Sequence, residues 1–73
     1  MIDFRLKTFL SVCRHLNYTR AAEEVHVTQP AVTQHIKFLE GEYGCTLFEY
    51  RGKQLFLTEK GSLLQQLANQ LLQ

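Results

Sequence analysis

The segment from Thr28 to Glu40 reads Thr-Gln-Pro-Ala-Val-Thr-Gln-His-Ile-Lys-Phe-Leu-Glu, and it constrains the fold more than any other part of the chain. Thr28 is a favourable N-cap, and Pro30 is tolerated in a first helical turn, where its missing N–H would have no partner. We therefore expect a helix over about 28–40. At about 100° per residue, one narrow apolar face of this helix holds Val32, Ile36, Leu39 and Tyr43.

The opposite face of this helix carries side chains of the kinds that read DNA. It displays Pro30, Thr33, Gln34 and Lys37, and no acidic residue occurs from Gln29 to Leu39. Amides, a hydroxyl and a lysine suit a major groove, where base edges offer acceptors and donors beside the phosphates. The alternative is an ordinary solvated helix face.

A shorter helix is expected just before this one. Residues 20–26 form a helical run that we expect Thr19 to cap, and the adjacent Ala21 and Ala22 allow another helix to approach closely. Only the residues around His26 to Thr28 separate the two helices. A pair of short helices joined by so tight a turn predicts a helix-turn-helix.

The first segment predicts a long helix that supports the core. Its buried stripe follows i, i+3, i+4 spacing and holds Leu6, Phe9, Leu10, Cys13 and Leu16. The pattern breaks near Asn17, which can cap a helix or take a left-handed backbone.

A β-hairpin is expected after Gly44, which suits a left-handed helix end. The apolar runs 47–49 and 55–57 flank a polar tip at residues 50–54. This pattern predicts the wing of a winged helix-turn-helix, with an irregular loop as the alternative. Arg51 and Lys53 flank Gly52 at the tip, where long cations can reach DNA phosphates; the alternative is a pair of solvated charges.

The last segment predicts a helix that begins after Thr58 as N-cap, with Glu59 well placed against the helix dipole. Its apolar arc holds Leu63, Leu64, Leu67, Ala68, Leu71 and Leu72. This arc is wider than one small domain needs, so we predict that a second copy covers part of it. The predicted dimer interface comprises Leu63, Leu64, Leu67 and Leu71; the alternative is that the first helix covers them all.

Composition fits one small domain. The 73 residues are 45% hydrophobic, and their formal net charge of +1 is low for a DNA-binding domain. All seven acidic residues lie outside the windows 29–39 and 50–58, which hold Lys37, Arg51 and Lys53. So few cations predict feeble binding by a monomer, and two domains paired on one site would compensate.

Other functions find little support in the sequence. No apolar run approaches the ~20 residues of a membrane span, and residues 1–5 do not resemble a signal peptide, so we expect a cytoplasmic protein. The possible metal ligands lack C-x-x-C or H-x-x-x-H spacing; they are Cys13, His15, His26, His35 and Cys45. We expect reduced thiols, no metal, no cofactor and no enzymatic activity.

The chain resembles the N-terminal DNA-binding domain of the LysR-type transcriptional regulators. The matching segments are 17–22, 27–34, 39–40, 47–49 and 57–59, with Phe9, Ile36, Gly44 and Gly61. They extend over nearly the whole chain. The family usually has a glycine and a serine near Leu16 and Asn17, and generally an arginine where this chain has Tyr50. The phosphate contact of that arginine would move to Arg51, become a tyrosine hydroxyl contact or be lost.

The resemblance implies a mainly α fold, a winged helix-turn-helix with a three-helix core, a two-stranded wing and a C-terminal linker helix. It implies that the recognition helix, about 28–40, lies in the major groove and that the wing, 50–54, lies on the DNA backbone or in the minor groove. It implies a DNA-binding domain over residues 1–58 and a dimerisation helix over 59–73, which leads in the family to an effector-binding domain absent here. We therefore expect an excised domain or a truncated product, with a naturally short protein as the alternative.

The predicted partners are double-stranded DNA with a pseudo-palindromic operator and a second copy of the chain. The predicted DNA-binding residues are Thr28, Gln29, Pro30, Thr33, Gln34, Lys37, Arg51 and Lys53. The alternative function is a helical protein-interaction module, in which the leucine arc is the working surface.

Overall fold

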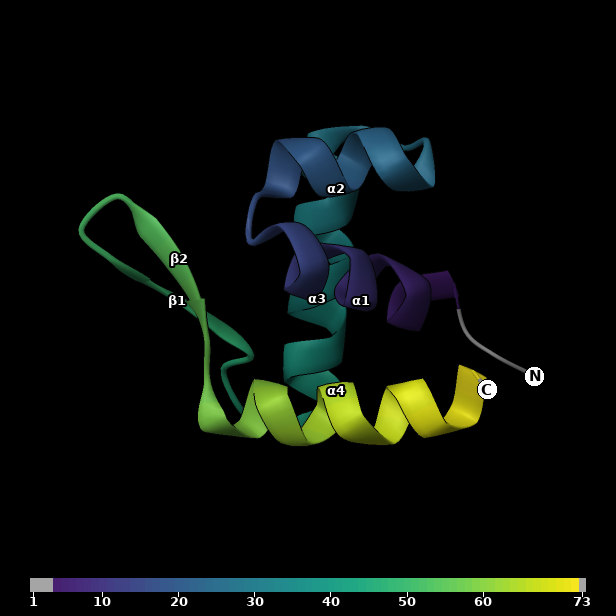
Figure 1. Cartoon of the computed structure of the whole chain (residues 1–73), viewed down its shortest axis with the longest axis vertical. Coiled ribbons are helices and arrows are strands. Elements are labelled where there is room, and N and C mark those ends of the chain that lie inside the picture. Colours follow the sequence, from purple (N-terminus) through teal and green to yellow (C-terminus); the bar gives the residue numbers. More distant parts are fainter. Residues whose placement is uncertain (1–3, 73) are drawn as a thin grey trace.

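The computed structural model describes residues 4–72, which form four helices and one antiparallel hairpin (Figure 1). The elements are α1 (Phe4–His15), α2 (Tyr18–Val25), α3 (Gln29–Tyr43), β1 (Phe48–Arg51), β2 (Gln54–Leu57) and α4 (Glu59–Leu72). The predicted mainly α winged helix-turn-helix is confirmed. Residues 1–3 of the predicted domain over 1–58 and residue 73 of the predicted helix over 59–73 lie outside the described residues.

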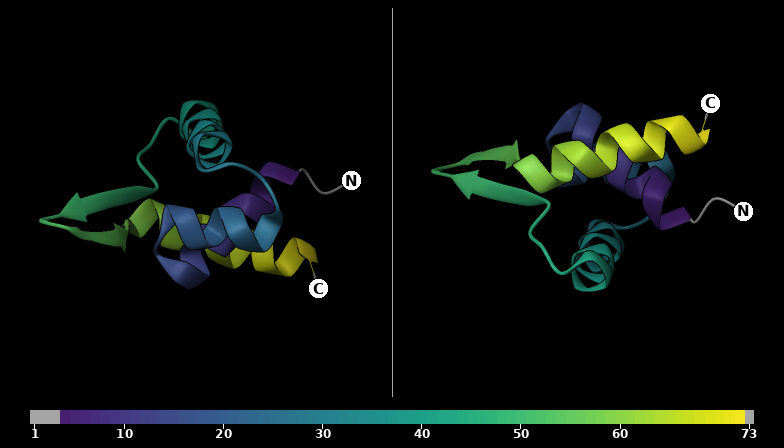
Figure 2. Two further views of the ribbon diagram at one scale, coloured as in Figure 1. Left: turned by 90° about the horizontal axis from the view of Figure 1, so that it is seen from above. Right: turned by 90° about the horizontal axis from the view of Figure 1, so that it is seen from below.

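The helices form one body, and the hairpin projects from its side. Figure 2 shows the hairpin pointing away from the start of α1, while α4 begins beside the hairpin and runs away from it. α3 runs across the direction of α4 (Figure 1). The wing and the helix-turn-helix therefore lie on neighbouring parts of the surface, and the end of α4 lies far from the wing.

The core centres on α1, which packs against the three other helices. Phe9, Val12, Val32 and Leu47 are fully buried. The predicted stripe of α1 is correct for Phe9 and Leu10, while Leu6 and Cys13 pack against the core from its edge. Thr8 and Ser11 are also fully buried, which the apolar pattern did not predict.

The prediction for Leu16 is wrong. Leu16 lies beyond the end of α1, where its N–H donates to the Val12 carbonyl at 2.7 Å. Its backbone is left-handed, with a φ of 48°, and its side chain is 40% exposed. This conformation turns the chain sharply from α1 into α2, so Leu16 cannot continue the buried stripe.

The helix caps follow the sequence at three of four predicted positions. The hydroxyls of Thr28 and Thr58 accept from the N–H groups of Ala31 and Gly61, and Gly44 ends α3 with a φ of 65°. The predicted cap at Thr19 is wrong. Asn17 caps α2 instead, because its side chain accepts from the Arg20 N–H at 2.9 Å, and α2 therefore begins two residues earlier.

The hairpin has a tighter turn than the sequence predicted. Arg51 pairs with Gln54 in the ladder, so only Gly52 and Lys53 form the loop. Gly52 has a φ of 64°, a conformation that suits glycine at the first position of a two-residue hairpin turn. The predicted tip at residues 50–54 was too wide, because the polar side chains of Tyr50, Arg51 and Gln54 did not indicate that these residues belong to the strands.

A polar cluster joins α1 to α2 at the base of the helix-turn-helix. The Glu24 carboxylate accepts hydrogen bonds from the buried Ser11 hydroxyl and, at 2.6 Å, from the Arg14 guanidinium. His15 Nε2 lies 3.3 Å from the same carboxylate oxygen. The hydrogen bonds from Ser11 and Arg14 lower the pKa of Glu24 to about 2 from its usual value of 4.5.

This cluster predicts an acid-dependent contribution to stability. Because the folded pKa of Glu24 is depressed, its contribution is present above pH 4.5 and is lost as the pH falls towards 2. We expect Glu24→Gln to lower the thermal midpoint at neutral pH, and the gap from wild type to narrow as the pH approaches about 3. Circular dichroism melts across this range measure the gap. Glu23→Gln is the control, and an equal, pH-independent loss in both variants would contradict the prediction.

Candidate nucleic-acid interface

One face of α3 anchors it in the core, as predicted. Val32, Ile36 and Leu39 are all at most 4% exposed. Tyr43, predicted on the same face, is 55% exposed; it lies in the last turn of α3 and lines an open pocket beside α4. α3 extends to Tyr43 and ends at Gly44, the helix end that the sequence predicted, so it continues three residues past the recognition segment 28–40.

Polar and aromatic contacts fix how α3 is turned against α1. His35 Nδ1 lies 3.0 Å from the buried Thr8 hydroxyl, and the His35 ring meets the edge of Phe4. The guanidinium of Arg5 lies 3.9 Å above the Phe38 ring. These contacts hold the orientation of the outer face of α3.

The outer face of α3 carries the residues predicted to meet DNA. Thr28, Gln29, Pro30, Gln34 and Lys37 are exposed, and Thr33 is half-buried. The side-chain amide of Gln29 donates to the Thr33 hydroxyl at 3.1 Å, and that hydroxyl lies 3.3 Å from the Gln29 carbonyl oxygen. The two side chains are thus held together at the first turn of α3.

Arg51 and Lys53, the two cations of the wing that were predicted to bind DNA, lie in different surroundings. Arg51 donates to Glu49 at 3.0 Å, and its guanidinium lies 4.7 Å from the centre of the Phe56 ring. Glu49, Arg51 and Phe56 therefore share one face of the hairpin. The register places Tyr50 opposite Leu55 on the other face, which turns towards α2.

A polar groove lies between the wing and the helix-turn-helix. It has a volume of about 240 Å³ and is lined by Leu16, Asn17, Tyr18, Thr19, Gln29, Tyr50, Lys53 and Leu55. Of the predicted DNA-binding residues, Gln29 and Lys53 meet there, and Arg51 does not. The sequence analysis did not place Thr19 or Tyr50 at this position, since strand register and the α1–α2 turn decide it.

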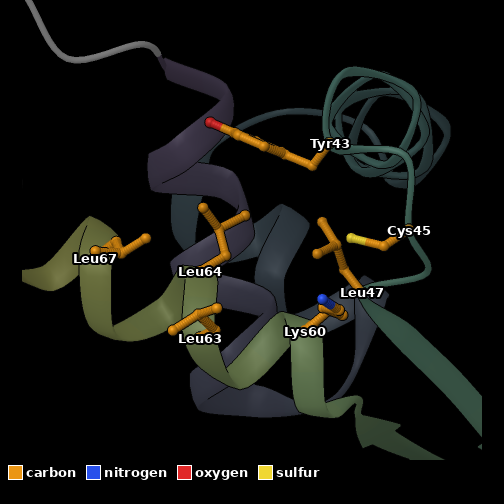
Figure 3. Close-up of a pocket in the computed structure, with 7 residues that line it drawn as sticks. All are labelled: Tyr43, Cys45, Leu47, Lys60, Leu63, Leu64 and Leu67. Carbon is orange, nitrogen blue, oxygen red and sulfur yellow. The ribbon is translucent and has the colours of Figure 1, made fainter.

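The apolar arc of α4 divides into two stripes. Leu64 and Ala68 are buried in the chain's own core, whereas Leu63, Leu67 and Leu71 are between 51% and 65% exposed. Figure 3 shows Leu63, Leu64 and Leu67 around an open apolar pocket, with Tyr43, Cys45 and Leu47 on its other side. Three of the four leucines predicted for a dimer interface therefore remain on the surface, and Leu64 packs inside.

The cysteines and histidines do not form a metal site within residues 4–72, where no three His, Cys, Asp or Glu side chains come close enough to hold an ion. Both cysteines are free thiols, and burial raises the pKa of Cys13 to about 12. The helices of this described region are also too short and too polar to cross a membrane.

These features together define a winged helix-turn-helix in which the exposed face of α3 carries no acid from Gln29 to Leu39. The chain belongs to the lysR family of bacterial regulatory helix-turn-helix proteins, whose family pattern matches residues 4–62. This family membership favours a DNA-binding regulator over a protein-interaction module. The resemblance inferred from the sequence motifs is confirmed.

Known proteins share both the sequence and the fold. The chain is 54% identical over 57 residues to a RuBisCO operon transcriptional regulator of Allochromatium vinosum, covering 78% of this chain and 19% of that protein. A crystal structure of a LysR-family transcriptional regulator from Eggerthella lenta superposes with a TM-score of 0.89 at 59% identity, covering 94% of this chain and 99% of that one.

A second solved structure holds DNA. The complex of the CbnR DNA-binding domain with DNA superposes with a TM-score of 0.89 at 32% identity, covering 99% of this chain and 83% of that one. The chain spans about a fifth of the length of the curated relatives that it matches.

Proposed function

We propose that this chain is the sequence-specific DNA-binding domain of a bacterial transcriptional regulator. The outer face of α3 carries the proposal, because it presents amides, hydroxyls and a lysine with no acid from Gln29 to Leu39, on a helix that the His35–Thr8 contact orients against α1. In this proposal α3 enters the major groove. The residues that bind DNA are Thr28, Gln29, Pro30, Thr33, Gln34, Lys37, Arg51 and Lys53.

We assign base recognition to the first turns of α3. Gln29, Thr33 and Gln34 project where base edges would lie, and a glutamine can form a bidentate pair with adenine. Pro30 and Lys37 lie beside them on the same face, towards the phosphates. Arg51 and Lys53 of the wing then bind the DNA backbone and carry no sequence code.

Two domains would bind one operator. A net charge of +1 gives a single domain little counterion release on duplex DNA, so pairing on two half-sites raises affinity. We propose that the exposed stripe of Leu63, Leu67 and Leu71 on α4 pairs with a second copy. The operator would then be pseudo-palindromic, with the domain over 1–58 and the dimerisation helix over 59–73.

The rest of the regulator is also a proposal. The curated relatives are about five times longer than the matched region, which leaves room for an effector-binding domain after α4. We further propose that the protein acts in the cytoplasm and has no enzymatic activity, in keeping with a transcriptional regulator.

An electrophoretic shift with pooled random duplexes, at low and moderate salt, tests the proposal directly. We expect a shift that weakens with salt, because phosphate contacts release counterions. The same experiment with a pool of single-stranded DNA is the control for binding through charge alone. No shift of any duplex, even at low salt, would favour the helical interaction module.

Specificity should depend on the linked pair at the start of α3. We expect the Gln29→Ala, Thr33→Ala double variant to lose roughly 1–3 kcal/mol of discrimination between its selected sites and altered ones. Repeated rounds of site selection with both proteins measure this loss. Gln66→Ala, on the exposed side of α4, is the matched control. An unchanged site preference in a folded double variant would contradict the assignment.

A further inference from the structure

The polar groove beside the wing is placed to hold part of the DNA backbone. We propose that one backbone phosphate enters this groove and is bound by Lys53 and the Tyr50 hydroxyl from the wing and by the Thr19 hydroxyl from α2. This inference rests on the proposed DNA binding and adds to it a defined phosphate site with two residues outside the predicted DNA-binding set.

The groove offers donors on two sides. The wing contributes Tyr50 and Lys53, and the start of α2 contributes Thr19. Among residues 4–72, these three side chains make neither hydrogen bonds nor ion pairs with other residues. Thr19 does not act as the cap of α2, since Asn17 fills that role. All three donors are therefore available for an anion.

The electrostatics of the groove favour a phosphate. Its eight lining residues include one cation and no acid. Tyr18 is a neutral hydroxyl at physiological pH, and its burial, the Glu40 carboxylate and Tyr50 raise its pKa further, to about 12. Glu40 does not line the groove, and its carboxylate accepts a hydrogen bond from the Leu47 N–H at 2.9 Å.

The groove also has room for one phosphate group. Its volume of about 240 Å³ is many times the roughly 10–15 Å³ that one water molecule needs in the same measure. Leu16 and Leu55 are its two apolar lining residues, and the other six carry polar or charged groups. A phosphate bound there would exchange its hydrogen bonds with bulk water for hydrogen bonds to fixed protein donors.

The position of the groove connects it to base reading. Gln29, the first residue of α3, lines the same groove and is hydrogen-bonded to Thr33. A phosphate bound there would belong to the backbone beside the bases that this turn of α3 contacts. Such a contact fixes the register of α3 on the duplex, which is the role of backbone contacts in recognition.

Arg51 provides the matched comparison. It carries the same charge as Lys53 two residues away, but it lies on the opposite face of the hairpin against Glu49 and Phe56. If both cations bind DNA, they must therefore bind different phosphates. The inference predicts that Tyr50, Lys53 and Thr19 act on one phosphate and that Arg51 does not.

Single replacement of phosphates by neutral methylphosphonates in a selected duplex tests this prediction. We expect Tyr50→Phe, Thr19→Val and Lys53→Gln each to weaken binding to unmodified DNA by about ten-fold, with the same loss on every sequence. Lys53→Gln should also lower the salt slope by about one unit per subunit. At one phosphate position in each half-site, the three losses should fall to less than two-fold, while any loss caused by Arg51→Gln should stay unchanged.

The outcomes separate this inference from the function on which it rests. Losses that persist at every methylphosphonate position, or that vanish at three different positions, would overturn the shared site. Equal behaviour of Lys53→Gln and Arg51→Gln at every position would also overturn it. A wild-type domain that shifts no duplex would overturn the proposed function as well. Thermal melts of the four variants, all altered at exposed positions, show whether each protein remains folded.

Discussion

Gly61→Ala should destabilise the domain more than any other single methyl added to a glycine of the chain. A Cβ at position 61 would lie 2.3 Å from the Leu47 carbonyl oxygen and 2.6 Å from Leu57 Cδ1. The first of these atoms is backbone, so α4 would have to move away from the start of β1. Overpacking of this kind costs typically 1–3 kcal/mol and occasionally more, a large share of the stability of a small domain.

Gly41→Ala supplies the control for this prediction. A Cβ at Gly41, inside α3, meets no atom within 4 Å, and the glycine is exposed. Alanine there should stabilise the helix by about 0.5–1 kcal/mol, because glycine loses more backbone entropy on folding. Urea denaturation of both variants gives the two changes in free energy of unfolding. A loss at Gly41 equal to that at Gly61 would show that close packing is not the cause.

The clash that Gly61→Ala would create lies at the junction between the wing and the helices. The Leu47 carbonyl already accepts from the Thr58 N–H at 3.0 Å and from the Thr58 hydroxyl at 3.1 Å. The Thr58 hydroxyl also lies 2.6 Å from the Thr46 carbonyl. These bonds join the two ends of the hairpin at its base. Gly61 completes the junction by letting α4 approach the same carbonyl.

The sequence was sufficient to predict those elements in which local chemistry and apolar periodicity agree. Thr28, Gly44 and Thr58 lie at the helix ends that their capping preferences indicate, and Val32, Ile36 and Leu39 form a buried stripe. The turn between α1 and α2 was not predictable in detail. Leu16 adopts a left-handed backbone there, which leucine rarely does, and Asn17 takes the cap expected of Thr19.

The candidate site was predictable on α3 and less so on the wing. An exposed helix face follows from a 3.6-residue period, so the polar residues of α3 could be assigned to it directly. Neighbouring residues of a strand point to opposite faces, so Tyr50 and Arg51 lie on opposite sides of the hairpin, and the register leaves Lys53 in the two-residue loop rather than in a strand. Composition alone therefore could not tell which of Arg51 and Lys53 faces the helix-turn-helix.

The leucines of α4 also show what the sequence pattern alone could not predict. Periodicity identifies a wide apolar arc, but the packing of α1 decides which part of it remains on the surface. Leu64 is 9% exposed and lies within the chain's own core, although it was predicted at the centre of a dimer interface. Leu63, Leu67 and Leu71 recur every four residues on the outer side of the helix. The proposed interface is thus narrower than the sequence indicated.

Leu71→Lys should convert the proposed dimer to a monomer while leaving the domain folded. Leu71 is 65% exposed, so the lysine can extend into solvent within one chain, whereas a dimer would have to bury its charge. Each leucine buried between two copies should contribute on the order of 1.5–3 kcal/mol, and a symmetric pair loses two. Sedimentation should therefore show half the wild-type mass, with the helical signal in the far ultraviolet retained.

Specific DNA affinity should fall together with the dimer. Two domains tethered on adjacent half-sites bind with an effective concentration that separate monomers lack, so we expect affinity for the full operator to drop by roughly 10²-fold or more. Asn69→Lys adds the same charge to an exposed position of α4 outside the leucine stripe and should leave both mass and affinity unchanged. A wild-type domain that stays monomeric at high concentration, or an Asn69→Lys variant that dissociates equally, would contradict the assignment. The outer leucines would then not pair two copies of the chain.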